Sequence, residues 1–250
     1  MSAAILPGAE PWSAAGGPHG ALVLHGFTGC PQSMRGLAEA FAAAGFAVEL
    51  PRLPGHGTDI ADMLTTSATD WARAAEETYV DLAARCERVV VCGLSMGATL
   101  TAWLATRHPE IAGLVVINGA FGALDPAMRT GLIEARDGGT DRVPGIGDDI
   151  ADPDGHELAY AETPVDGLIS LIDMMTELED ALPTISMPTL VVTSRQDHVV
   201  PPASSEMFAA RVGGPVEHVW LERSYHVATL DFDAPEIEQR AVAFARRVVT

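Results

Sequence analysis

The sequence predicts an α/β fold: a mostly parallel sheet with helices on both faces and a small inserted cap. Short apolar runs alternate with segments whose apolar residues recur at helical spacing, which is typical of a parallel sheet. These runs are continuously apolar, as expected of strands that are covered on both faces. Because 48% of the 250 residues are hydrophobic, the chain can build one large domain around one core.

In the first 120 residues, apolar runs and helical patterns follow one another in pairs. The expected strands are 21–24, 46–50, 89–92 and 114–117. The expected helices are 34–44, 70–86 and 98–107. Ser33 is a candidate cap for the first helix, which Gly45 ends in a left-handed conformation. Thr69 or Asp70 can cap the second helix.

After residue 120 this alternation stops, and it resumes only near residue 188. Strands are expected at 189–193 and 216–221, and a last helix carries Pro235 in its first turn. The stretch 121–187 contains one helical patch, at 168–178, and is too long for a plain loop in a compact domain. We therefore expect residues 1–120 and 188–250 to form the core. Residues 121–187 are expected to form a cap insertion over the carboxyl ends of the strands, where open α/β sheets bind ligands.

The charge of the chain excludes several classes of protein. A formal net charge of −19 argues against nucleic acid as a partner, because that affinity comes from clustered basic residues. The chain has no lysine, which excludes a P-loop lysine and a Schiff-base lysine. We expect the acidic residues to form a solvated surface. Neither the three cysteines nor His25 and His56 have metal-ligand spacing, so no metal and no cofactor are predicted.

The sequence also bears on the compartment in which the protein works. No apolar run approaches the roughly 18 residues that a membrane span needs, so stable membrane insertion is not expected. The N-terminus lacks a basic leader followed by a long apolar stretch, which favours a cytoplasmic location. The three cysteines are expected to be reduced thiols.

The segment Gly93-Leu-Ser-Met-Gly97 matches the pattern G-x-S-x-G and lies between an expected buried strand and an expected helix. In that setting the turn exposes the serine at the end of the strand in a strained backbone conformation, and its neighbours must be small. Ser95 is therefore a candidate nucleophile. The structural alternative is a tight turn with an unused hydroxyl.

A serine hydroxyl needs a base to accept its proton and an acid to hold that base in the right tautomer. On a sheet of this kind the acid follows a late strand and the histidine follows the last one. Asp197 comes directly after strand 189–193, and His226 lies between strand 216–221 and the last helix. The alternatives are a turn-forming acid and a solvated histidine. His198, beside the acid, is expected to be a supporting or surface residue.

Nucleophilic attack on a carbonyl creates an oxyanion, which needs two fixed N–H donors. The backbone amide after the nucleophile is that of Met96, and the loop after the first strand offers the amide of Phe27. The Phe27 side chain itself is expected to cover the core.

Five segments resemble the bacterial monoacylglycerol lipases and their close carboxylesterase relatives, which have the α/β-hydrolase fold. They are HGFTGCPQSMR at 25–35, LPRLPGHGT at 50–58, GLSMGATLT at 93–101, DHVVPP at 197–202 and SYHVATLD at 224–231. The resemblance implies the same triad and the same oxyanion hole as the topological argument, and a small cap. It also implies that Ile146 lines the substrate pocket and that Glu157 meets the glycerol end. A carboxylate can accept hydrogen bonds from two hydroxyls, which suits a glycerol diol. The alternative for Glu157 is a solvated acid on a cap helix.

The resemblance implies a serine ester hydrolase that cleaves monoacylglycerols through an acyl-enzyme on Ser95. Its substrate is then a small lipid ester. Two alternatives stay open at this stage. One is a carboxylesterase for short and medium acyl chains without a preference for glycerides. The other is a non-catalytic ligand receptor on the same scaffold, because a fold does not fix a function.

Overall fold

The computed structural model describes residues 3–122 and 126–250. Within these residues, one seven-stranded sheet runs in the order β1-β3-β2-β4-β5-β8-β9. Its strands are β1 (Trp12–Ala14), β2 (His19–Leu24), β3 (Ala47–Leu50), β4 (Arg88–Leu94), β5 (Gly113–Ile117), β8 (Thr189–Ser194) and β9 (Val216–Leu221). All neighbouring strands are parallel except β1, which pairs antiparallel with β3 at one edge. The predicted mostly parallel sheet is confirmed.

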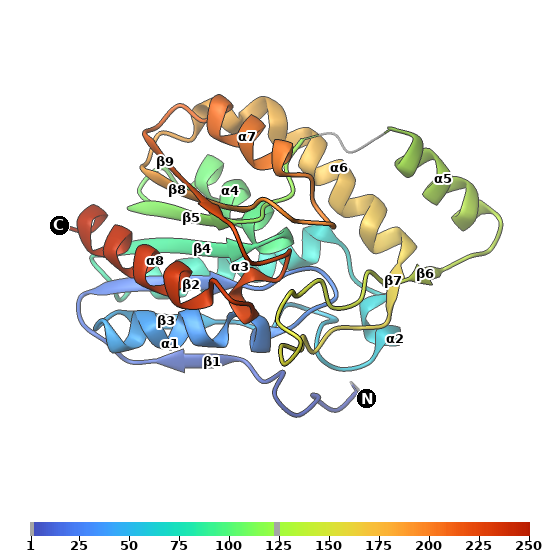
Figure 1. Ribbon diagram of the computed structural model, residues 1–250, viewed down its shortest axis with the longest axis horizontal. Helices are drawn as coiled ribbons and strands as arrows, with labels where there is room; N and C mark the ends of the chain where they lie inside the picture. The colour runs from blue at the N-terminus through green and yellow to red at the C-terminus, as the bar shows by residue number, and fades with distance from the viewer. Residues whose placement is uncertain (1–2, 123–125) are drawn as a thin grey trace.

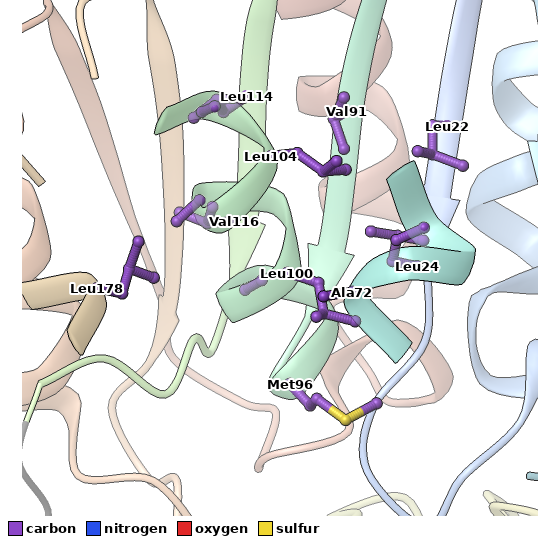
Figure 2. Close-up of a cluster of buried hydrophobic side chains, with 14 of the residues drawn as sticks. Leu22, Leu24, Ala72, Val91, Met96, Leu100, Leu104, Leu114, Val116 and Leu178 are labelled. Carbon is purple, nitrogen blue, oxygen red and sulfur yellow. The ribbon is translucent and has the colours of Figure 1, made fainter. Parts of the chain in front are cut away.

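Helices cover both faces of this sheet and form two hydrophobic cores (Figure 1). On one face lie α1 (Arg35–Ala43) and α8 (Ala234–Val248). On the other lie α3 (Ala68–Ala83), α4 (Met96–Arg107), α6 (Val165–Ala181) and α7 (Pro202–Arg211). Successive side chains of a strand point to opposite faces, so Val90 joins the first core and Val91 the second. Figure 2 shows Leu100 and Leu104 of α4 in the second core.

The N-caps of two helices differ from those predicted. A 3₁₀ turn (Pro31–Met34) precedes α1, so Ser33 lies inside that turn and does not cap the helix. The N-cap of α3 is Ser67, whose N–H and hydroxyl both donate to Asp70 Oδ2 at 3.1 and 2.9 Å. Asp70 thus serves the cap from the third helical position. Gly45 has φ of +95° and ends α1 as predicted.

The stretch 121–187 holds more regular structure than the one predicted helical patch, which is part of α6. The further elements within this stretch are α5 (Pro126–Asp137), β6 (Arg142–Pro144), β7 (Glu162–Pro164) and a 3₁₀ turn (Leu182–Thr184). The short helix α2 (Ile60–Met63), earlier in the chain, is also absent from the expected helices. Strands β6 and β7 form an antiparallel pair. Helix α5 packs on α6 around a small core of Leu132, Val165, Ile169 and Ile172 (Figure 1).

The loop between β6 and β7 runs beside the carboxyl ends of the central strands. Tyr160 N–H donates to the carbonyl of Thr28, in the loop after β2, at 3.1 Å. Ala151 N–H donates to Asp231, in the segment after β9, at 2.8 Å. This loop is therefore tied to two of the core loops that carry predicted site residues. None of the helices in the described ranges is long and apolar enough to cross a membrane.

Candidate active site

Ser95 occupies a strained turn between β4 and α4, with φ of 55° and ψ of −118°. A Cβ atom at Gly93 would lie 2.1 Å from the backbone of Gly97. A Cβ atom at Gly97 would lie 2.2 Å from the carbonyl oxygen of Leu24 in β2. Only glycine fits at these two positions, because the colliding atoms belong to the main chain. The N–H of Ser95 donates to the carbonyl of Ile117 at 2.9 Å, which anchors the turn to β5.

The structure brings Asp197 and His226 together. The His226 ring Nδ1 lies 2.8 Å from Asp197 Oδ2, and their side chains are only 9% and 1% exposed. Asp197 Oδ1 accepts the backbone N–H groups of Val199 and Val200 at 2.9 and 2.8 Å. A carboxylate only accepts hydrogen bonds, so Nδ1 of the neutral ring carries the proton and Nε2 keeps its lone pair.

Ser95 lies at the same edge of the sheet, directly after β4, which pairs with β5. Asn118, directly after Ile117 in β5, donates through Nδ2 to the carbonyl of His226 at 2.8 Å. The loop of His226 is thus anchored one residue away from the carbonyl that anchors Ser95. Within the described ranges, the Ser95 hydroxyl makes no hydrogen bond to the His226 ring.

Asn118 is a residue that sequence reasoning missed. Its Oδ1 accepts the N–H of Ser194 at 2.7 Å, so one side chain links the ends of β5 and β8 to the His226 loop. Its φ of 45° lies in the left-handed region, which asparagine tolerates better than most residues. An asparagine directly after a buried strand was the available signal.

The predicted oxyanion donors lie at the starts of α4 and of the loop after β2. Met96 is the first residue of α4, so its N–H has no acceptor inside the helix. The Phe27 N–H also has no acceptor within the described residues. Gly26, beside it, faces Ser95: a Cβ on that glycine would lie 3.6 Å from Ser95 Cβ. The Phe27 ring packs on Trp71 with a centroid distance of 5.3 Å.

His25 stabilises the loop after β2 through two hydrogen bonds. Its Nδ1 donates to the carbonyl of Gly26 at 2.9 Å, and its Nε2 accepts the N–H of Leu53 at 3.1 Å. The ring is fully buried, and burial lowers its pKa to about 4, so it stays neutral. The spacing of His25 in the sequence excludes a metal role, and its contacts fix the backbone beside Phe27.

Glu157 lies in the loop between β6 and β7, not on a helix as one alternative held. A Cβ atom at Gly29 would come within 2.6 Å of Glu157 Oε1, so glycine there makes room for the carboxyl group. Burial raises the pKa of this carboxyl to about 7, and nearby His226 acts in the opposite direction. Ile146, in the same loop, is 68% exposed.

Residues 21–240 match the model of the alpha/beta hydrolase family. The chain belongs to this family. It is 46% identical over 245 residues to the thermostable monoacylglycerol lipase of Bacillus sp. (strain H-257), across 96% of this chain and 95% of that protein. It is 26% identical over 243 residues to a carboxylesterase of Bacillus subtilis (strain 168), across 96% and 97% of the two chains.

Solved structures agree with the family assignment. One described under LipS and LipT, two metagenome-derived lipolytic enzymes, is 45% identical with a TM-score of 0.93, over 98% of this chain and 100% of that chain. The monoacylglycerol lipase of Paleococcus ferrophilus, at 20% identity and a TM-score of 0.76, covers 94% and 98% of the two chains and has the same fold. The resemblance, the fold class and the assignment to the ester hydrolases are confirmed.

The turn at Ser95 generates a prediction for stability. Gly97→Ala places a methyl group against the main chain of β2, and we expect a loss of about 1–3 kcal/mol in the free energy of unfolding. Urea denaturation measures this. The control is Gly131→Ala in α5, where a Cβ meets nothing within 4 Å and removal of a helical glycine stabilises by up to about 1 kcal/mol. Equal stabilities for the two variants would contradict the packing argument.

Glu157 generates a prediction for the pH dependence of stability. Its folded pKa of about 7 exceeds its ordinary value of 4.5, so the stability that the protonated form provides is fully present below about pH 4.5. It is lost as pH rises towards 7, by at most about 3 kcal/mol. Glu157→Gln removes this titration. The free energy of unfolding of the variant, measured by urea denaturation, should therefore rise relative to that of the native protein between pH 4.5 and 7.5.

The control for this experiment is Glu87→Gln, which removes the same charge from an exposed position. If both variants change with pH in the same way, the effect reflects net charge and not the burial of Glu157.

Proposed function

We propose that this protein hydrolyses monoacylglycerols to fatty acid and glycerol through an acyl-enzyme on Ser95. The observation that carries the proposal is the buried 2.8 Å contact between His226 Nδ1 and Asp197 at the edge where the strained turn presents Ser95. This contact leaves His226 Nε2 free to accept a proton. A serine hydroxyl becomes a nucleophile only with such a base.

In the proposed reaction, Ser95 Oγ attacks the ester carbonyl while His226 Nε2 takes the hydroxyl proton. Asp197 holds the ring and stabilises its positive charge. The amides of Met96 and Phe27 donate to the oxyanion, each contributing roughly 3–4 kcal/mol to the stability of the transition state. The C–O bond to glycerol then breaks, and His226 returns the proton to the departing oxygen. Water then attacks the acyl-enzyme with His226 again as the base, which releases the fatty acid and restores the Ser95 hydroxyl.

The substrate class rests on Glu157 and on the similarity to a monoacylglycerol lipase at 46% identity. The Glu157 carboxyl lies against Gly29, in the loop that carries the proposed oxyanion donor Phe27. Its oxygens can accept hydrogen bonds from the two hydroxyls of a glycerol esterified at one end. The exposed side chain of Ile146 is proposed to contact the acyl chain, and residues 121–187 to act as the cap.

The proposal extends to partners and compartment. A small lipid ester is the proposed partner, and the formal charge of −19 argues against nucleic acid. Cys30, Cys86 and Cys92 are all free thiols in the structure, which supports a reducing cytoplasm as the working location.

Replacement of the nucleophile tests the chemistry. Ser95→Ala should lower kcat by on the order of 10⁶, because only the oxyanion hole and substrate binding remain. Ester hydrolysis rates measure this, with a fluorophosphonate probe reporting on Ser95 in the native protein. A variant within tenfold of the native rate would refute the assignment, and a folded native protein that resists the probe would favour the receptor alternative.

Replacement of Glu157 separates a monoacylglycerol lipase from a general carboxylesterase, the activity named for the relative at 26% identity. Glu157→Ala should raise KM for a monoacylglycerol and leave KM for nitrophenyl butyrate, which lacks the glycerol hydroxyls, nearly unchanged. Asp154→Ala, at an exposed acid of the same loop, is the control. Equal changes for both substrates would favour the general carboxylesterase.

A further inference from the structure

Asp149 contacts both loops that hold the proposed acid and base. It lies in the loop between β6 and β7, and its side chain is 13% exposed. Asp149 Oδ2 accepts the backbone N–H of His226 at 3.0 Å and that of His198 at 3.2 Å. Its Oδ1 lies 2.8 Å from Nδ1 of the His198 ring. Its backbone carbonyl accepts the N–H of Val227 at 3.1 Å.

These contacts fix the separation between two loops that come from different strands. His198 directly follows Asp197, so a single carboxylate oxygen binds the amide next to the acid and the amide of the base itself. Hydrogen bonds to a carboxylate are stronger than those between neutral groups. The 2.8 Å contact between Asp197 and His226 depends on this separation, because both side chains are short and buried.

We propose that Asp149 is a positioning residue for His226. It holds the ring of His226 between Asp197 and Ser95 by accepting two backbone N–H groups, that of His226 itself and that of His198, the residue after Asp197. This inference rests on the proposed function, since Asp149 acts on the reaction only through the base. The same loop carries Glu157, so Asp149 also links the proposed glycerol contact to the base.

Asp231, in the segment after β9, offers a matched control because it bonds the same loop between β6 and β7. It accepts the N–H groups of Ala151 and Asp152 at 2.8 and 3.0 Å, and that of Tyr225 at 2.8 Å. Asp231 thus ties the loop between β6 and β7 to the core by the same kind of bond. It makes no hydrogen bond to residues 197, 198 or 226 in the part of the chain that the structure describes. A purely structural tether predicts similar behaviour for the two aspartates.

The experiment compares Asp149→Ala, Asp149→Asn and Asp231→Ala with the native protein. It measures melting temperature, kcat and KM for nitrophenyl butyrate, and the rate of fluorophosphonate labelling of Ser95, all well below the melting temperatures. Asp149→Ala should lower kcat and the labelling rate by about 10- to 100-fold, with KM within about twofold. Asp149→Asn keeps an oxygen acceptor for the two amides and should recover most of kcat.

Asp231→Ala should lower the melting temperature at least as much, with kcat within about threefold. If it does not fold, His198→Ala takes its place: it leaves Asp149 bound to the His226 amide and should lower kcat less than Asp149→Ala does. The inference fails if kcat falls in step with melting temperature in all variants, or if Asp149→Ala keeps native kcat. Failure of the native protein to label would overturn the proposed function itself, which separates the two outcomes.

Discussion

The close approach of main chain to main chain at the turn between β4 and α4 is the constraint on which the rest of the site depends. Gly93 and Gly97 leave no room for a Cβ atom, and Ser95 between them has positive φ. A non-glycine residue in such a conformation costs roughly 1–3 kcal/mol and persists only where its surroundings impose it. Here β4 is buried on both faces and α4 packs against it, so the two cores hold the turn strained.

The remaining groups reach this turn on loops, and buried carboxylates fix those loops. Asp197, Asp231 and Asp233 each accept two or more backbone N–H groups through their carboxylates. The Asp149 carboxylate accepts two, and its backbone carbonyl accepts a third. A carboxylate has lone pairs for several donors, so it can satisfy loop amides that have no ladder partner. In a chain with a formal charge of −19, part of the acidity therefore serves as internal scaffolding, beside the expected solvated acidic surface.

Signals that repeat locally could be read from the sequence, and contacts between distant segments could not. Continuous apolar runs located the central strands, and the glycine spacing located the turn at Ser95. Strand β1 is three residues long at a sheet edge, too short for a period to emerge. Asn118 and Asp149 matter because they meet residues about 108 and 77 positions away, and no motif marks such a pairing. The α3 cap was misplaced because Ser67, Thr69 and Asp70 offer competing oxygens within four residues.

The stretch 121–187 contains two parts with different attachments. The loop between β6 and β7 is tied to core loops through Asp149, Asp231 and the Tyr160 amide. Helix α5 instead packs on α6 around a core of four buried residues, with the exposed Arg129–Asp173 ion pair beside it. An exposed ion pair contributes little free energy, so burial of these apolar side chains is what attaches α5 to α6. The contacts around Glu157 and His226 therefore come from the loop between β6 and β7 and from the core loops, while α5 is attached through α6.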